Sequence, residues 1–282
     1  MRTPIRLGAV SYLNTRPLVY GLDRQPDRFA VRFDVPSQCA TLLHTGEVDL
    51  GLIPSIEYLR GDYRIVPDTA IASEGPVASV AVFSRQPLSE VRSVALDTSS
   101  RTSAALLRVL CRDRFGIAPT FVSHGPDLEA MLGRADAALL IGDPALWTDH
   151  VALGLRRTDL GQEWTEHTGL PFVWAFWAGR EGAIDDAGVG ALIDARDRGV
   201  SAIDEIAAAY AGTDAVVFTR TRDYLRTNVS FSLGERHLEA LRWFYASATR
   251  LGIVASEGQP RFFEPPSSLV EPGSRPADVA RR

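Results

Sequence analysis

Residues 6–22, RLGAVSYLNTRPLVYGL, decide the fold, because a short strand pattern runs directly into a polar turn and a helix pattern. We expect a strand over 6–10 and a helix near 14–22. The alternation of strand-like and helical patterns continues to about residue 150. This alternation predicts βαβ units and mostly parallel pairing, so the predicted class is α/β.

Two similar half-patterns follow one another, each with a strand, a polar loop and helix, a strand, a helix and a strand. The predicted strands of the first half are 6–10, 31–35 and 49–53, with a helix capped at Ser37. Those of the second half are 93–96, 119–122 and 137–141, with helices near 101–115 and from Asp127. Residues 79–84 and 172–177 look like strands that cross between the halves. Two crossings predict a hinge, and hence a two-lobed, periplasmic-binding-protein-like (type II) fold with two mixed sheets and a ligand cleft between them.

The predicted lobes divide the chain unevenly. The first lobe combines residues 1–83 with 178–256, and the second covers 84–177. Helical patterns at roughly 183–198, 202–211, 217–227 and 233–251 belong to the first lobe, the last with Ser232 and Glu235 at a capping-box spacing. Residues 257–282 are rich in Pro, Gly and Ser, which predicts a poorly ordered tail.

Composition excludes several classes of function. The net charge of −5 lacks the basic excess of a nucleic-acid-binding protein. All 30 basic residues are Arg, so no lysine is available for Schiff-base chemistry. Cys39, Cys111 and the five scattered histidines show no metal-ligand spacing. We therefore expect no metal site and no nucleic-acid partner.

The ends and apolar runs of the chain bear on its location. No stretch reaches 18 uninterrupted apolar residues, so we expect no membrane span. The chain opens Met1-Arg2-Thr3-Pro4 without an apolar signal segment, which favours a cytoplasmic protein. Nothing in the sequence indicates an obligate protein partner.

Polar residues follow the first strand of each half, where open α/β sheets bind ligands. The segment from Ser11 to Leu18 (SYLNTRPL) places Asn14 and Thr15 at the start of a helix, where backbone N–H groups favour a carboxylate. The alternative is that Asn14 or Thr15 only caps this helix.

The second such segment, residues 97–103 (DTSSRTS), has five hydroxyls and one guanidinium. It suits an oxyanion, with Arg101 available for a bidentate pair. The alternative is a redundantly capped helix with Arg101 in solvent. Ser55 and Asp143, beside Pro54 and Pro144, also face the predicted cleft, although a capping role is favoured for Asp143.

A run of aromatic residues offers a surface for stacking on a ligand ring: Trp164 and, on the predicted return strand, Phe172, Trp174, Phe176 and Trp177. Alternation of this kind is more typical of core packing.

The SYLNTRPL segment resembles the opening signature of the MqnA family, the chorismate dehydratases of the futalosine route to menaquinone. Further matching segments follow in the family's order across about residues 5–250: DLGLIPSIEY (49–58), GPVASV (75–80), TSSRTS (98–103), IGD (141–143) and LPFV (170–173).

The resemblance implies that chorismate loses its C4 hydroxyl and C3 proton to give 3-[(1-carboxyvinyl)oxy]benzoate, without a cofactor. It implies that Asn14 and Ser79 are catalytic, although Ser84 remains open as the alternative serine. A substrate carboxylate is the candidate base, so no side chain need act as one. The expected substrate-binding residues are Ser11, Thr15, Ser55, Thr98, Ser99, Arg101, Thr102, Ser103 and Asp143.

Two other functions remain open. An exported solute-binding protein shares the expected fold but requires a signal peptide. The sister enzyme, 1,4-dihydroxy-6-naphthoate synthase, also shares the fold, but its opening motif differs from the Asn14 segment.

Overall fold

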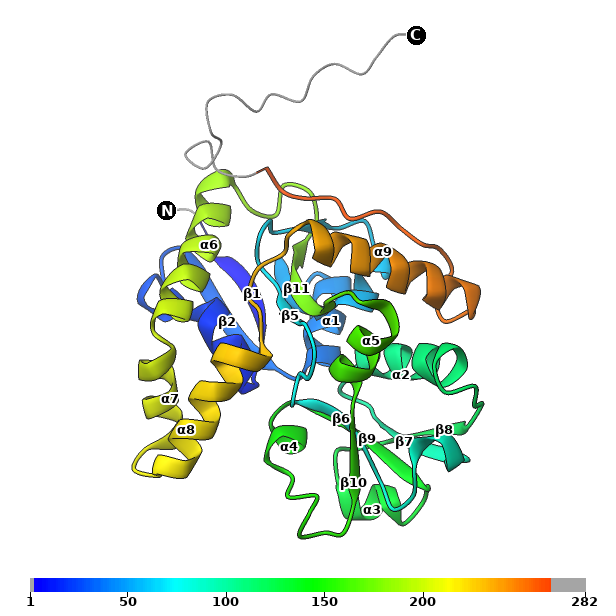
Figure 1. Ribbon diagram of the computed structural model, residues 1–282. Helices are drawn as coiled ribbons and strands as arrows, with labels where there is room; N and C mark the ends of the chain where they lie inside the picture. Colours follow the sequence, from blue (N-terminus) through cyan, green and yellow to red (C-terminus); the bar gives the residue numbers. More distant parts are fainter. Residues whose placement is uncertain (1–2, 265–282) are drawn as a thin grey trace, which may run out of the picture.

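The computed structural model describes residues 3–264 and contains two mixed β-sheets, one in each of two lobes (Figure 1). The sheet of the first lobe has the order β2-β1-β3-β11-β4, with β5 also paired to β11. Its strands are β1 (Ile5–Val10), β2 (Phe29–Asp34), β3 (Leu50–Pro54), β4 (Arg64–Ile65), β5 (Ile71–Ser73) and β11 (Phe172–Gly179). Strands β1, β2 and β3 are parallel, whereas β11 is antiparallel to its neighbours.

The second lobe repeats the arrangement with the order β10-β6-β9-β7-β8. Its strands are β6 (Val80–Ser84), β7 (Ser93–Asp97), β8 (Thr120–His124), β9 (Ala137–Ile141) and β10 (Arg156–Asp159). Strands β7, β8 and β9 are parallel, and β6 is antiparallel to β9 and β10. The predicted α/β class with two mixed sheets is confirmed.

Helices cover both sheets. Those between the strands of the first lobe or after β11 are α1 (Pro36–Thr45), α6 (Asp186–Ser201), α7 (Ile203–Ala211), α8 (Ala215–Asp223) and α9 (Glu235–Arg250), with the shorter turns η1 (Leu13–Val19), η2 (Leu22–Arg24), η3 (Ser55–Arg60) and η5 (Tyr224–Asn228). Those of the second lobe and the return to the first are η4 (Leu88–Glu90), α2 (Arg101–Asp113), α3 (Leu128–Leu132), α4 (Gly142–Trp147) and α5 (Leu160–Thr168).

The chain passes between the lobes twice, between β5 and β6 and again between β10 and β11. The predicted lobe boundaries lie after residues 83 and 177. By sheet membership, however, all of β6 belongs to the second lobe and all of β11 to the first. The crossings are therefore the short segments that precede these two strands.

Part of the expected tail is ordered. Phe262 forms a β-bridge with Ile65, and Phe263 is buried. Residues 257–264 thus extend along the first lobe, and the remainder of the expected tail, 265–282, lies outside the described residues.

Four helices differ from their sequence-based expectation. The helix expected near 14–22 is the 3₁₀ turn η1, with Pro17 inside it, and proline cannot donate the N–H that a regular helix requires. Helix α1 begins at Pro36, one residue before the expected cap Ser37. The predicted capping box at Ser232 is wrong, because Gly234 is the N-cap of α9 and the His237 side chain accepts its backbone N–H. The helix expected over 217–227 is α8 followed by the wider π-helical turn η5.

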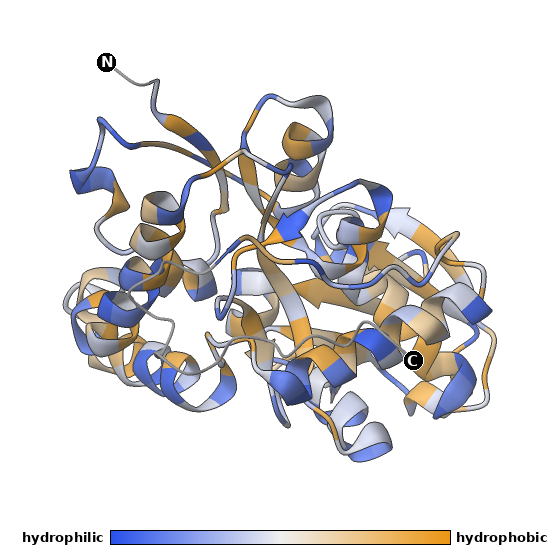
Figure 2. Ribbon diagram, turned by 90° about the horizontal axis from the view of Figure 1, so that it is seen from above, coloured by the Kyte–Doolittle hydropathy of each residue, from blue (hydrophilic) through white to orange (hydrophobic). Residues whose placement is uncertain are grey.

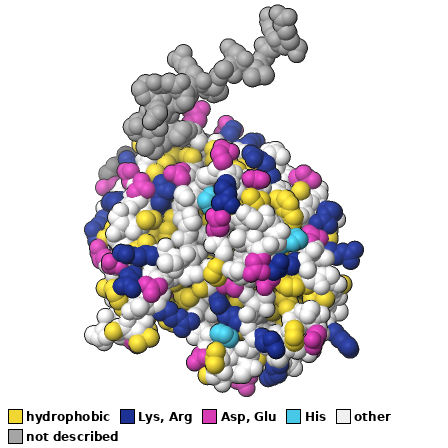
Figure 3. Space-filling model, viewed as in Figure 1, with side chains coloured by type: hydrophobic (Ala, Val, Ile, Leu, Met, Phe, Trp, Pro, Cys, Tyr) yellow, Lys and Arg dark blue, Asp and Glu magenta, His cyan; other side chains and the backbone are white. Residues whose placement is uncertain are grey.

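The apolar residues concentrate on the strands and on the inward faces of the helices (Figure 2). Arginine and acidic side chains are intermingled on the face that Figure 3 shows, with no single basic surface. Among residues 3–264, no helix is long and apolar enough to cross a membrane.

Candidate active site between the lobes

A cavity lies between the lobes where the carboxyl ends of β1, β3 and β9 meet the start of α2. Its lining residues are Val10, Tyr12, Asn14, Pro36, Pro54, Ile71, Val77, Ser79, Val80, Ser100, Thr102, Ser103, Ile141, Gly142, Trp174 and Ala175. None of these lining residues carries a charge. Hydroxyls, one amide and the N-terminus of α2 are thus the polar groups that this wall offers to a ligand, and a helix N-terminus favours an anion.

The structure brings Asn14 and Ser79 into this cavity from separate segments. Asn14 lies on η1, directly after β1, and its Oδ1 atom is buried without a hydrogen-bond partner. Ser79 immediately precedes β6 and is also buried. Ser84, the alternative serine, lies at the far end of β6 and donates a hydrogen bond to the carbonyl of Gln86. Of the two serines, only Ser79 lines the cavity.

The turn before Ser79 is held in a strained conformation. Ala78 has a φ of 62°, which is unusual for a residue with a side chain. The carboxylate of Asp159 accepts hydrogen bonds from the backbone N–H groups of Val77 and Ala78, at 3.0 and 2.8 Å. Arg157 in turn pairs with Asp159 at 3.1 Å. Strain that the surroundings enforce is typical of functional sites. Here the hydrogen bonds to Asp159 hold the turn that precedes Ser79.

The hydroxyl-rich segment at the start of α2 has a divided role. Ser100, Thr102 and Ser103 line the cavity, and the Ser100 side chain caps the helix by accepting the Ser103 N–H. Thr98 is exposed and lies outside the cavity lining. Ser99 donates to Asp97 at 2.6 Å and lies 3.3 Å from the Tyr12 hydroxyl of the first lobe.

Thr102 also joins the lobes. Its Oγ1 accepts the backbone N–H of Ile56 and lies 3.4 Å from Ser55 Oγ. Ser55 itself donates to the carbonyl of Val173 at 2.8 Å and lies outside the cavity lining. Part of the predicted anion site therefore fastens one lobe to the other.

Arg101 is directed away from the cavity. Its guanidinium pairs with Glu57 at 2.6 Å, and the Glu57 side chain is fully buried. His44 and Arg60 also contact this carboxylate, at 2.9 and 3.1 Å. Burial acts to raise the pKa of Glu57, but the hydrogen bonds from His44 and Arg101 hold it below its ordinary value. The expected pairing of Arg101 with a substrate carboxylate is replaced by an ion pair between the lobes, because Glu57 lies within its reach.

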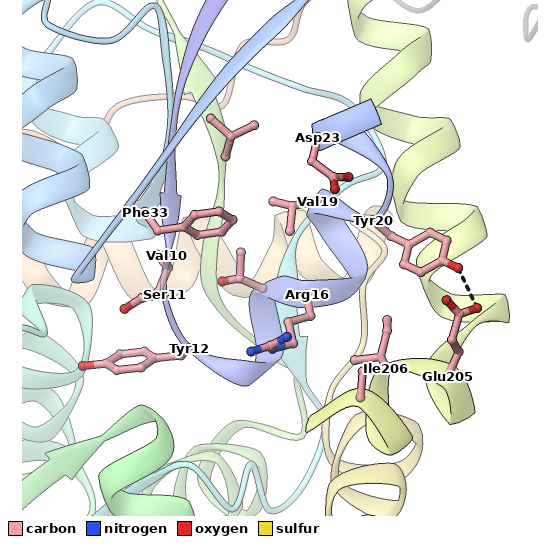
Figure 4. A pocket seen from close by; sticks show the side chains of 13 residues that line it. Val10, Ser11, Tyr12, Arg16, Val19, Tyr20, Asp23, Phe33, Glu205 and Ile206 are labelled. Carbon is pink, nitrogen blue, oxygen red and sulfur yellow. Dashed lines mark hydrogen bonds between the residues drawn. The ribbon is translucent and has the colours of Figure 1, made fainter. Parts of the chain in front are cut away.

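Ser11 and Thr15 face a second hollow, of about 570 Å³, on the outer side of Tyr12 (Figure 4). Apolar side chains such as Phe33 and Val19 form much of its wall, and Tyr20 donates to Glu205 at its rim. Ser11 and Thr15 are close to Asn14 in the sequence, but Asn14 lines the cavity between the lobes instead. The compact 3₁₀ geometry of η1 distributes neighbouring side chains over different surfaces.

Asp143 connects the two lobes from the first turn of α4. Its carboxylate accepts the Leu13 N–H at 3.0 Å and the Tyr210 hydroxyl at 3.3 Å. Burial raises the pKa of Asp143 above its ordinary value. Asp143 therefore does not cap its own helix through this contact. It accepts an N–H of η1, which belongs to the opposite lobe.

Sequence reasoning did not single out three residues that shape this site, Tyr12, Ser100 and Tyr224, and it favoured a core role for a fourth, Trp174. Ser100 lay inside the hydroxyl-rich segment, and Trp174 lay in the aromatic strand for which core packing was favoured. Trp174 does both, since it is buried, lines the cavity and packs edge to face against Phe172. Tyr224 lies far from every other site residue in the sequence, and no spacing identifies it.

In the described part of the chain, no group of three or more His, Cys, Asp or Glu residues is arranged to hold a metal ion. Burial raises the pKa of both cysteine thiols to about 12. Neither thiol is activated as a nucleophile or ligand.

Comparison with known proteins identifies the family. Residues 5–250 match the family described as menaquinone biosynthesis. The chain belongs to this family. A chorismate dehydratase of Thermus thermophilus is 37% identical to the chain over 271 residues, which are 89% of this chain and 93% of the relative. A chorismate dehydratase of Campylobacter jejuni is 29% identical over 174 residues, 60% of this chain and 64% of the relative.

Two solved structures that are similar to this chain support the fold. Protein AF1704 of Archaeoglobus fulgidus has a TM-score of 0.72 at 18% identity, covering 89% of this chain and 98% of its own. The periplasmic aliphatic sulphonate binding protein SsuA of Escherichia coli has a TM-score of 0.65 at 16% identity, covering 99% of both chains. The expected periplasmic-binding-protein-like architecture is confirmed.

Proposed function

We propose that this protein is a chorismate dehydratase, which converts chorismate to 3-[(1-carboxyvinyl)oxy]benzoate and water. The observation that carries the proposal is the meeting of Asn14 and Ser79, from separate segments, in an uncharged cavity at the N-terminus of α2. Both residues lie in segments that resemble the family's motifs. The relatives named above supply the reaction.

The proposed chemistry requires little of the protein. The C3–H bond breaks and its electron pair forms the new ring double bond, while the C4–O bond breaks and its electron pair leaves with oxygen. The C3 proton and the departing hydroxide together make up one water, and the ring becomes aromatic. The main tasks of the protein are then to orient the substrate and to exclude bulk water.

We assign these tasks to different walls of the cavity. The N-terminus of α2, with Ser100, Thr102 and Ser103, suits a substrate carboxylate. Asn14 and Ser79 face the reacting part of the ring from the opposite lobe and the crossing segment. Trp174 and Ile71 provide an apolar surface for the ring. A substrate carboxylate remains the proposed base, since no ionisable acid or histidine belongs to this wall.

Incubation of the purified protein with chorismate tests the proposal. We expect 3-[(1-carboxyvinyl)oxy]benzoate to accumulate far faster than in a control without protein. Tight binding of chorismate without turnover would instead support a solute-binding protein. The expected cytoplasmic location is part of the same proposal, because a biosynthetic enzyme works where its substrate is made.

A further inference from the structure

Tyr224 lies directly behind the proposed catalytic pair. Its hydroxyl donates a hydrogen bond to Ser79 Oγ at 2.8 Å, and the tyrosine is 3% exposed. The residue begins η5, the π-helical turn that follows α8. Single π-helical turns recur at functional sites because they place a side chain where a regular helix does not.

The phenol is the donor in this hydrogen bond. Burial raises the pKa of Tyr224 well above its ordinary value, so the phenol keeps the proton that it donates. Ser79 accepts that proton in the hydrogen bond, and its own O–H remains available to donate. Because Ser79 lines the cavity, a ligand in the cavity is the natural acceptor.

Asn14 completes the group. It lines the same cavity as Ser79, and its amide oxygen, Oδ1, is buried without a hydrogen-bond partner. A buried acceptor left unpaired costs free energy, so a ligand group that donates to it would be favoured.

We propose that Tyr224 is a positioning residue that orients Ser79, so that Ser79 presents a donor to the substrate beside the unpaired acceptor of Asn14, Oδ1. This inference rests on the proposed function. The Ser79 hydroxyl then hydrogen-bonds the C4 oxygen as its bond to carbon breaks, and Tyr224 strengthens that bond by polarising Ser79. No proton needs to leave the protein in this arrangement.

The test compares Tyr224→Phe with a matched control, Tyr245→Phe. Tyr245 is also fully buried, and its hydroxyl donates a hydrogen bond of the same length, 2.8 Å, to the carbonyl of Ser55. Both variants remove one oxygen from a buried ring. We expect Tyr224→Phe to lower kcat for chorismate at least tenfold with KM changed less than threefold, and Tyr245→Phe to leave kcat within twofold of the wild type. The two variants should lower Tm by similar amounts.

A double-variant cycle with Ser79→Ala shows whether Tyr224 acts through Ser79. We expect Tyr224→Phe to lower kcat less than threefold when Ser79 is already alanine. A wild-type kcat in Tyr224→Phe would overturn the inference. So would a Tyr224→Phe substitution that lowers kcat by the same factor in the wild type and in Ser79→Ala. A wild-type protein that does not convert chorismate would instead contradict the proposed function.

Discussion

The carboxylate of Asp143, in the second lobe, accepts a hydrogen bond from the backbone N–H of Leu13, in the first, at 3.0 Å. Leu13 directly precedes Asn14, so this contact links closure of the lobes to the position of the proposed catalytic amide. The α7–α8 pair adds to the same closure: Tyr210 contacts both Asp143 and Trp147 of α4, and Arg220 lies over the Trp147 ring. Figure 1 shows α7 and α8 extending from the first lobe beside the second.

Asp143→Ala is expected to weaken closure. It leaves the Leu13 N–H without its partner, at a cost of about 1–3 kcal/mol. We expect KM for chorismate to rise about tenfold, since about 1.4 kcal/mol corresponds to a factor of ten. Steady-state kinetics measure this. An unchanged KM and kcat would show that the contact does not contribute to closure.

Gly142→Ala is expected to disturb the cavity wall. Gly142 has a φ of 63°, and a Cβ there would lie 2.5 Å from the Tyr12 ring. Gly154 has the same φ, but no atom lies within 4 Å of its Cβ position, so Gly154→Ala is the matched control for backbone strain. We expect kcat/KM to fall at least tenfold in Gly142→Ala and to stay within twofold in Gly154→Ala. Equal kinetics in the two variants would remove the steric argument.

Arg101→Gln tests whether Arg101 pairs with Glu57 or instead binds a carboxylate of the substrate. Because its guanidinium pairs with buried Glu57, we expect Tm to fall by several degrees while KM changes less than threefold. Arg112→Gln, an exposed arginine on the same helix, controls for the loss of charge. A KM increase of a hundredfold with an unchanged Tm would mean that Arg101 holds a substrate carboxylate after all.

Acid is expected to weaken the contacts that the Glu57 carboxylate makes with its basic neighbours, Arg101, Arg60 and His44. The pKa of Glu57 in the folded protein lies below its ordinary value of 4.5, so the group contributes stability that is present above about pH 4.5. That stability is lost as the pH falls through the folded-state pKa. We therefore expect the Tm difference between the wild type and Glu57→Gln to be largest near neutral pH and to shrink below pH 4.5. Thermal unfolding from pH 3 to 8 measures it, and a difference independent of pH would contradict the assignment.

The sequence predicted the elements whose signals are local. The alternation of strands and helices and the polar residues after β1 and β7 were enough to predict two lobes with a cleft. The sequence resemblance pointed to Asn14 and Ser79, and the fold brings both to the same cavity. The 3₁₀ form of η1 was missed, because the effect of Pro17 on a short turn depends on how that turn packs.

Long-range partners were not predictable in the same way. Arg101 looked free to bind an anion, because nothing in its own segment shows that Glu57, 44 positions earlier, lies within reach. Tyr224 is 145 positions from Ser79, and a tyrosine in a helical pattern carries no signal of what its hydroxyl contacts. These pairings arise only when the two lobes and the last helices assemble.

The most direct test of the account is the rate at which purified wild-type protein and Asn14→Ala convert chorismate, with the product identified by chromatography and mass. The account predicts that the wild type forms 3-[(1-carboxyvinyl)oxy]benzoate and water, and that Asn14→Ala, with an unchanged circular dichroism spectrum, is at least a thousandfold slower. Near-normal turnover by Asn14→Ala would contradict the role of Asn14. Absence of product from a folded wild-type protein would contradict the proposed function itself.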